Sequence, residues 1–227
     1  MISQTQSVAS VVLDHSECAE VFTRHRIDFC CHGSQSIEEA ARKREVPIDT
    51  LLSELRHAMD ARKKVGKGLP VADPRTLSTP RLVAHIIARH HEYLRHALPF
   101  VQGLAVKVAR VHGDHHPRLC ELSSAVGTLT ETLLAHLDQE EETLFPLLLG
   151  KSRDDSAVQR LLHQMQDEHL TVAKTLEEIR TSSADFVIPE WACNSYRTLF
   201  AELRQIESDI FTHVHLENHV LVPRFGT

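Results

Sequence analysis

The sequence has no long apolar run, no signal peptide and no excess of positive charge, and each absence excludes a class of protein. No segment approaches the roughly 20 apolar residues that a membrane-spanning helix needs. The start, Met1-Ile-Ser-Gln, lacks the basic residues and apolar centre of a signal peptide. A formal net charge of −6 gives no electrostatic support for binding nucleic acid or an anionic membrane. We therefore expect a cytoplasmic protein with neither nucleic acid nor membrane as a partner.

Cysteine is also too sparse for a disulfide scaffold. The chain has five cysteines, an odd number, and only Cys30 and Cys31 are grouped. The hydrophobic fraction of 42% and the charged fraction of 25% are ordinary for a globular protein. A chain of 227 residues can therefore bury a substantial core.

Histidine, in contrast, is abundant, and it recurs with glutamate at a fixed spacing. His136 stands four residues before Glu140, and His213 stands four residues before Glu217. Both copies continue to a leucine and a proline in the same register, Leu144 with Pro146 and Leu221 with Pro223. Side chains at i and i+4 share one face of a helix, with Cβ atoms about 5 to 6 Å apart. Two such helices can therefore hold two metals between them.

Cap and turn signals divide the chain into helical segments. Apolar spacing predicts a helix over residues 8–27, a capping box of Ser36 and Glu39 starts a second, and Pro47 starts a third. Long helical patterns follow at about 80–110, 119–149, 156–181 and 189–221, joined by short polar connectors, one of them at 150–155.

The predicted fold is therefore all-α and has two parts. Residues 1–62 form a small helical domain with the vicinal cysteine pair, and residues 63–79, rich in glycine, proline and basic residues, form a linker. Residues 80–227 form an up-down-up-down four-helix bundle.

Alternating spacings of three and four residues place polar side chains among the apolar residues of the core. The predicted core stripe of the second long helix is Leu122, Val126, Leu129, Leu133, His136, Glu140, Thr143 and Leu147. The third carries His169 and the fourth carries His213 and Glu217, whereas His163, His215 and His219 fall outside the stripes. An unpaired buried carboxylate costs several kcal/mol, so inward glutamates beside inward histidines require a cation.

The first long helix allows two registers. One stripe is Ala84, Ile87, His91, Leu94, Leu98 and Val101. The other is Val83, Ile86, His90, Tyr93, Ala97 and Phe100. Periodicity alone does not choose between His90 and His91.

These residues carry a family resemblance over nearly the whole chain. The bundle resembles a hemerythrin-like domain, and Ile27-Asp-Phe-Cys-Cys-His-Gly33 resembles the small N-terminal, ScdA-type domain of the RIC family, the di-iron proteins for repair of iron centres. The family's first-helix ligand is a histidine shortly before a Leu-Arg pair, which corresponds to His91 before Leu94-Arg95. His32 departs from the family, in which the cysteine pair is usually followed by Gly-Gly.

The resemblance implies a metal centre and a function. The implied ligands are His91, His136, Glu140, His169, His213 and Glu217. They would hold two non-haem iron ions bridged by the two glutamates and by an oxo or hydroxo group. The implied role is repair of iron-sulfur proteins damaged by nitrosative or oxidative stress, through supply of iron rather than conventional enzymatic turnover. The alternative is a protein that binds or reduces nitric oxide or dioxygen, and a homodimer is compatible with either role.

In this setting the cysteine pair is a candidate active group. Adjacent Cα atoms lie about 3.8 Å apart, closer than the roughly 4.4 to 6.8 Å usual for disulfides, so a bond between Cys30 and Cys31 would be strained and easily reduced. A redox or transient iron-handling role fits such thiols. We also expect the pKa of a thiol to be lowered by the nearby residues Arg24, His25, Arg26 and His32. The alternative is a turn in which two small side chains merely pack.

Overall fold

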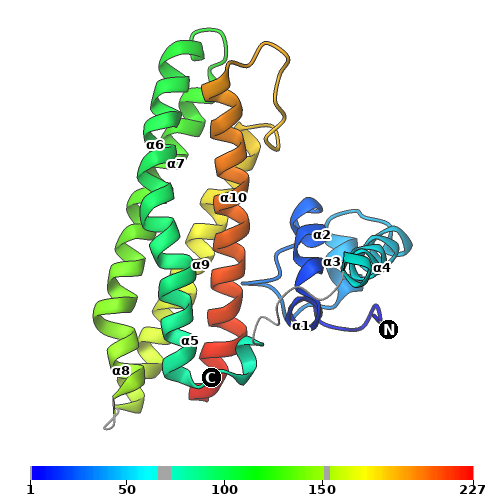
Figure 1. Cartoon of the computed structure of the whole chain (residues 1–227), viewed down its shortest axis with the longest axis vertical. Coiled ribbons are helices and arrows are strands. Elements are labelled where there is room, and N and C mark those ends of the chain that lie inside the picture. Colours follow the sequence, from blue (N-terminus) through cyan, green and yellow to red (C-terminus); the bar gives the residue numbers. More distant parts are fainter. Residues whose placement is uncertain (1, 66–72, 151–153, 227) are drawn as a thin grey trace. The chain divides into compact units, whose positions relative to one another are not determined.

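The computed structural model describes residues 2–65, 73–150 and 154–226, and within these ranges the chain is helical with no β-strand (Figure 1). This confirms the all-α prediction. Two compact units are formed by Met1–Leu77 together with Phe211–Gly226, and by Ser78–Ile210. No helix in the described part of the chain is both long and apolar enough to cross a bilayer.

The N-terminal residues form short helices. In order they are α1 (Val8–Asp14), a 3-10 turn (Ser16–Cys18), α2 (Ala19–Arg24), α3 (Ile37–Lys43), α4 (Ile48–Val65) and a second 3-10 turn (Pro74–Thr76). The single helix expected over residues 8–27 is wrong, because His15 leaves the helical region at φ −142° and ψ 76°. The capping box is confirmed: Ser36 accepts from the backbone of Glu39, and the Glu39 carboxylate accepts from the backbone of Ser36. Of the expected linker, residues 66–72 lie outside the described part.

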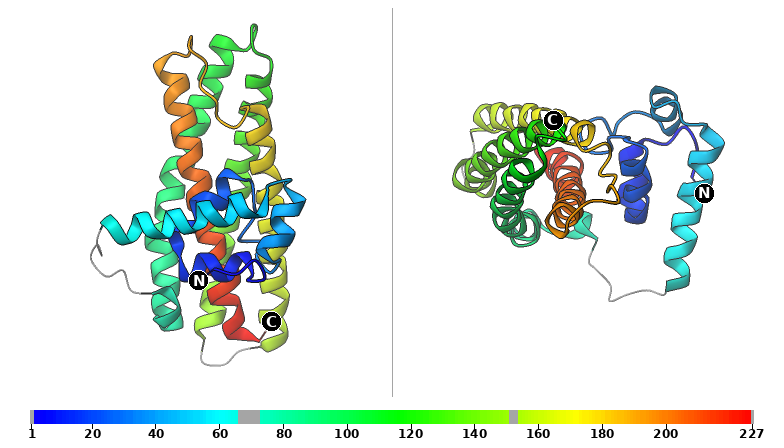
Figure 2. Two further views of the ribbon diagram at one scale, coloured as in Figure 1. Left: turned by 90° about the vertical axis from the view of Figure 1, so that its right-hand side faces the viewer. Right: turned by 90° about the horizontal axis from the view of Figure 1, so that it is seen from above.

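The long helices follow one another up, down, up and down (Figure 2). They comprise α5 (Thr79–Ile86), a π turn (Ile87–His91), α6 (Glu92–His112), α7 (Arg118–Gln139), a π turn (Glu140–Leu144), α8 (Phe145–Leu149), α9 (Asp155–Ser182), α10 (Asn194–Leu216), a π turn (Glu217–Leu221) and a final 3-10 turn (Val222–Phe225). Of the connector expected at residues 150–155, residues 151–153 lie outside the described part.

The fourth long helix begins later than predicted. Residues 189–193 form a turn, in which the backbone of Ala192 donates to the carbonyl of Pro189. The Arg197 side chain donates to the carbonyls of Glu190 and Ala192 and so satisfies groups that a helix would have paired internally. Helix α10 therefore starts at Asn194 rather than near residue 189.

The π turn at Ile87–His91 explains why the first long helix allowed two registers. Before the turn the buried positions follow one stripe, with Val83 and Ile86; after it they follow the other, with His91, Leu94 and Leu98. A π turn adds one residue to a helical turn and shifts every later side chain to a neighbouring face. Each predicted stripe is therefore correct on one side of the turn only.

The π turn at Glu140–Leu144 has the same effect on the second stripe. The prediction is correct from Leu122 to Glu140 but wrong for Thr143 and Leu147. Leu144 and Leu148 are buried in their place. In α9 His163 is exposed as expected, and the stripe that the same spacing predicts is confirmed as buried: Val158, Leu162, Met165, His169, Val172, Leu176 and Ile179.

One ion pair in the bundle is almost inaccessible to water. The Arg180 guanidinium donates through Nε and Nη2 to the two oxygens of Glu207, a side chain that is 2% exposed. Burial raises the pKa of Glu207 despite the opposing hydrogen bonds from Arg180. The carboxylate therefore depends on a single guanidinium for its charge balance.

We expect Arg180→Ala to lower the free energy of unfolding by about 3 to 5 kcal/mol, because it leaves a buried carboxylate without its cation. Without Arg180 the pKa of Glu207 rises further, so the loss is largest above that pKa and shrinks as the pH falls through it. Urea unfolding of the metal-loaded chain at neutral and acid pH measures both effects. Arg75→Ala, which removes exposed pairs with Asp14 and Asp73, is the control and should cost at most about 1 kcal/mol per pair. Equal losses for the two variants would contradict the prediction.

Candidate metal centre

Three of the six predicted ligands lie in the π turns, and the other three lie in α-helices. His91 is the last residue of the first π turn, and Glu140 and Glu217 are the first residues of the other two. The remaining histidines are His136 in α7, His169 in α9 and His213 in α10. π turns are frequent at functional sites because they redirect a side chain without ending the helix.

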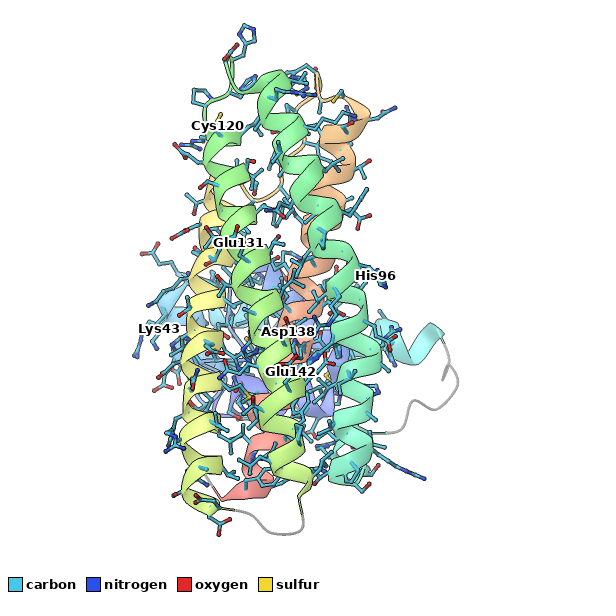
Figure 3. All side chains as sticks on the ribbon, turned by 90° about the vertical axis from the view of Figure 1, so that its left-hand side faces the viewer. Lys43, His96, Cys120, Glu131, Asp138 and Glu142 are labelled. Atoms are coloured by element: carbon cyan, nitrogen blue, oxygen red, sulfur yellow. The ribbon has the colours of Figure 1, made fainter. Side chains whose placement is uncertain are left out.

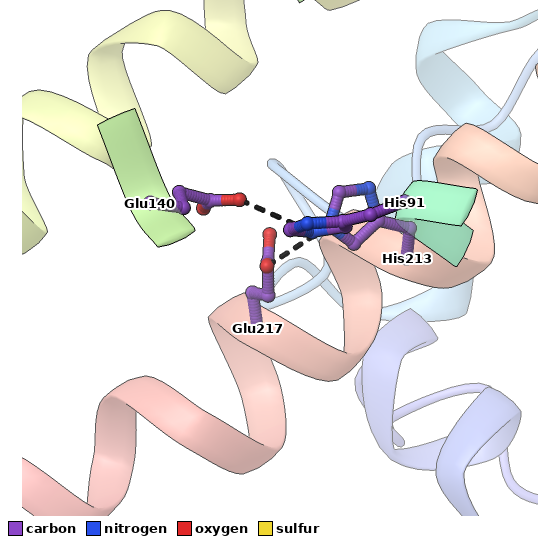
Figure 4. Close-up of side chains that lie close together, drawn as sticks. All are labelled: His91, Glu140, His213 and Glu217. Atoms are coloured by element: carbon purple, nitrogen blue, oxygen red, sulfur yellow. Dashed lines mark hydrogen bonds and ion pairs between the residues drawn. The ribbon is translucent and has the colours of Figure 1, made fainter. Parts of the chain in front are cut away.

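Several of their ligand atoms are close neighbours. Nε2 of His91 lies 3.4 Å from one oxygen of Glu140, and Nε2 of His136 lies 3.3 Å from the other. The Nε2 atoms of His136 and His169 are 3.2 Å apart. Nε2 of His213 lies 2.9 Å from an oxygen of Glu217, as expected for an i,i+4 pair (Figure 4).

These atoms form two groups that share both carboxylates. In each group the ligand atoms lie within 4.8 Å of one another. One group contains His91, Glu140, His213 and Glu217, and the other contains His136, Glu140, His169 and Glu217. Each group thus combines two imidazoles of its own with two common glutamates.

The outer nitrogens of two ligands are held by further carboxylates. Nδ1 of His91 donates to Glu141 at 2.9 Å, and Nδ1 of His136 donates to Glu168 at 2.7 Å. A carboxylate only accepts, so Nδ1 carries a proton, and in the neutral imidazole this leaves the Nε2 lone pair to bind a cation. Burial would raise the pKa of Glu141, but the hydrogen bonds from His91 and Arg95 hold it below its ordinary value. The hydrogen bond from His136 lowers the pKa of Glu168 against the opposing effect of burial.

The residues present fit a cation. All six side chains are at most 3% exposed, so water does not solvate the two carboxylates. Two buried carboxylates beside imidazoles require compensating positive charge. Nitrogen and oxygen ligands of this kind suit first-row transition metals.

His90, the other histidine that periodicity allowed, lies outside both groups. Its Nδ1 is paired with Asp209 at 3.0 Å. The sequence prediction also overlooked Glu141 and Glu168 as partners of the ligands. The available signal was position, since each directly neighbours a predicted ligand, Glu140 or His169, in the sequence.

The loop between α2 and α3 that carries Cys30 and Cys31, the cysteine loop, is hydrogen-bonded to the end of α10 and to the π turn that follows it. Nδ1 of His215 donates to the carbonyl of Phe29 at 3.1 Å, and the side chains of Asn218 and His219 donate to the carbonyl of Cys30. His215, expected outside the core stripe, is therefore buried against this loop at 3% exposure. Burial, together with the neighbouring His219, lowers its pKa to about 4.

The expected lowering of thiol pKa is wrong for Cys30. Burial raises the pKa of its thiol well above the ordinary value, and Cys31 and the Asp28 carboxylate add to the shift. Two of the four residues expected to lower the thiol pKa contact another carboxylate instead: Arg24 and His25 both contact Glu54. Both cysteines are free, with the sulfur of Cys30 buried and that of Cys31 half-buried.

Comparison with known proteins gives two matches in the predicted order. Residues 4–59 match ScdA_N, a domain of unknown function, and residues 82–225 match the hemerythrin HHE cation-binding domain. The chain is a hemerythrin-like, cation-binding protein, because its helical bundle matches this domain and buries a cluster of histidines and glutamates.

Relatives match over almost the whole chain. Iron-sulfur cluster repair protein ScdA of Staphylococcus haemolyticus is 32% identical over 233 residues, which covers 100% of both chains. The protein of the same name from Staphylococcus epidermidis is 30% identical over 97% of this chain and 98% of its own. Iron-sulfur cluster repair protein YtfE of Yersinia pseudotuberculosis is 30% identical over 97% of this chain and 96% of its own. The chain belongs to this ScdA and YtfE family, which confirms the resemblance drawn from the sequence.

The carboxylates of Glu141 and Glu168 should strengthen metal binding, because they orient the imidazoles of His91 and His136. We expect Glu141→Gln and Glu168→Gln each to weaken metal binding by about 10- to 100-fold, because an amide holds the imidazole ligand less firmly than a carboxylate. Chelator competition on the metal-loaded chain measures the change.

Glu142→Gln is the matched control, since Glu142 lies in the same π turn as Glu141 but points outward (Figure 3). It should retain metal as the unmodified chain does. Retention that is unchanged in all three variants would show that the outer carboxylates do not support the ligands.

Proposed function

We propose that this chain is a di-iron protein that repairs iron-sulfur clusters damaged by nitrosative or oxidative stress, and that it does so by supplying iron. The observation that carries the proposal is the pair of overlapping ligand groups, in which Glu140 and Glu217 belong to both. Relatives similar over the full chain are named as iron-sulfur cluster repair proteins, which supports the same role.

The ligand set supports two exchangeable ions. Two imidazoles and two shared carboxylates give each ion four protein ligands, so octahedral iron would keep open positions. Iron bound in this way supplies the ion that a damaged cluster has lost. The mixed nitrogen and oxygen set suits iron without excluding manganese or zinc.

The cysteine loop supports a role for thiols in the transfer. Three side chains donate hydrogen bonds to its carbonyls: His215, Asn218 and His219. They lie in the same segment as the proposed ligands His213 and Glu217, at the end of α10 and in the π turn that follows it. A change in the position of this segment therefore reaches the loop through direct hydrogen bonds. We propose that Cys30 and Cys31 receive iron from, or return it to, the centre.

The proposal includes the remaining expectations from the sequence. Damaged iron-sulfur proteins are the partners, nitric oxide or dioxygen the small ligands, and the cytoplasm the compartment. A homodimer is compatible with this role.

Iron content tests the metal part of the proposal. The purified chain should contain about two irons, as expected for a pair of facing helices that each carry a carboxylate. His169→Ala should lose at least about half of this iron, because it removes a ligand of one group. His163→Ala, on an exposed face of the same helix, should retain it. A folded chain that takes up no iron would contradict the proposal.

Reactivation of a damaged iron-sulfur enzyme tests the thiol part. We expect the double variant Cys30→Ser, Cys31→Ser to keep its iron but to reactivate the enzyme no faster than buffer does. The matched control is Cys120→Ser, Cys193→Ser, which replaces two exposed thiols and should be fully active. Full repair by the first variant, with nitric oxide binding intact, would favour the gas-binding alternative over thiol-dependent transfer.

A further inference from the structure

A second set of metal-binding atoms lies outside the bundle, in the loop between α2 and α3. An oxygen of Asp28 and the sulfurs of Cys30 and Cys31 lie within 4.8 Å of one another. All three residues belong to one short loop. Their grouping is therefore a property of the loop itself.

The separation of the two sulfurs suits chelation. They lie 3.7 Å apart, whereas the two sulfurs of a disulfide lie about 2.05 Å apart. Two thiolates bound to one tetrahedral cation through bonds of about 2.3 Å have their sulfurs about 3.7 to 3.8 Å apart. The loop thus holds the pair at the edge length of a tetrahedral thiolate site without any bond between them.

The carboxylate is held in place beside them. One oxygen of Asp28 accepts from the backbones of Cys30 and Cys31 at 2.9 and 2.8 Å and lies 3.1 Å from the sulfur of Cys30. The other oxygen is 2.7 Å from Nδ1 of His32. Such outer hydrogen bonds fix the direction of a metal-binding carboxylate. They also give His32, a departure from the family pattern, a defined contact.

Two members of the group, Asp28 and Cys31, are partly accessible, unlike the ligands of the bundle. Cys31 is half-buried, and a cavity of about 260 Å³ adjoins Asp28 and His32. Lys43 and Arg44 also line this cavity. Three protein ligands leave one tetrahedral position for an incoming group, which is the property of a site from which a cation exchanges.

We propose that Asp28, Cys30 and Cys31 form a second cation site, which takes one thiophilic divalent cation and keeps one coordination position open for exchange. As each sulfur–metal bond forms, the thiol releases its proton to bulk water, and no electrons are transferred. The inference rests on the proposed function only in naming ferrous iron as the natural occupant.

Cobalt(II) is the probe, because thiolate ligation gives it an intense charge-transfer absorption that imidazole and carboxylate ligands do not give. Added to the full chain with its bundle centre filled and its thiols reduced, about one equivalent should bind with this absorption. Cys30→Ser and Cys31→Ser should each lose about half or more of the intensity, since each removes one of two sulfurs.

Asp28→Asn tests the oxygen ligand while preserving the loop, because the amide oxygen still accepts from the two backbone N–H groups. Both sulfurs remain, so the absorption should persist while the affinity falls at least about 10-fold. The control Cys120→Ser, Cys193→Ser should bind cobalt as the unmodified chain does.

A second measurement needs no variant and so does not depend on its folding. Cadmium(II) should protect the half-buried Cys31 of the unmodified chain from alkylation and leave the exposed Cys120 and Cys193 reactive, as read by mass spectrometry. An absence of thiolate absorption and of protection in the reduced chain would overturn the second site, even where iron content and repair follow the proposed function. Loss of repair with cobalt binding intact would instead count against the proposed function alone.

Discussion

The structure depends on the compensation of two buried negative charges. Glu140 and Glu217 are at most 2% exposed, and the groups closest to them are imidazoles rather than Lys or Arg. Desolvating carboxylates is costly unless a cation or strong donors replace water, so the fold is most stable when positive charge lies between them. Metal binding and folding are thereby coupled: the free energy of binding adds to the stability of the bundle.

The π turns position the side chains of His91, Glu140 and Glu217 in the core. Each of the three lies where a ligand begins or ends the turn, and each shifts the buried stripe by one position. The three turns lie beside the buried histidine and glutamate groups. The local loss of helical regularity thus accompanies the ligand geometry, at His91 as at the two glutamates.

Much of this architecture could be predicted from the sequence, because it follows from periodicity and repetition. The all-α fold, the capping box at Ser36 and the buried stripe of α9 follow from such patterns. The register beyond a π turn could not be predicted, because composition does not show where a residue is added to a helical turn. For that reason the periodic pattern places Thr143 in the core, although it is exposed. The raised pKa of Cys30 could not be predicted either, because Arg24, which is close to it in the sequence, contacts Glu54 in the folded structure. The choice of His91 over His90 came from resemblance rather than periodicity.

Residues 213–219, at the end of α10 and in the π turn that follows it, contribute both to the ligand groups and to the contacts with the cysteine loop. His213 and Glu217 belong to the ligand groups, whereas His215, Asn218 and His219 hold the carbonyls of the cysteine loop. Deleting or inserting one residue within this segment would rotate the later residues by about 100° around the helix axis and so change which side chains face the ligand groups and which face the loop. The contacts with both neighbours therefore depend on the length of this segment as well as on the identity of its residues.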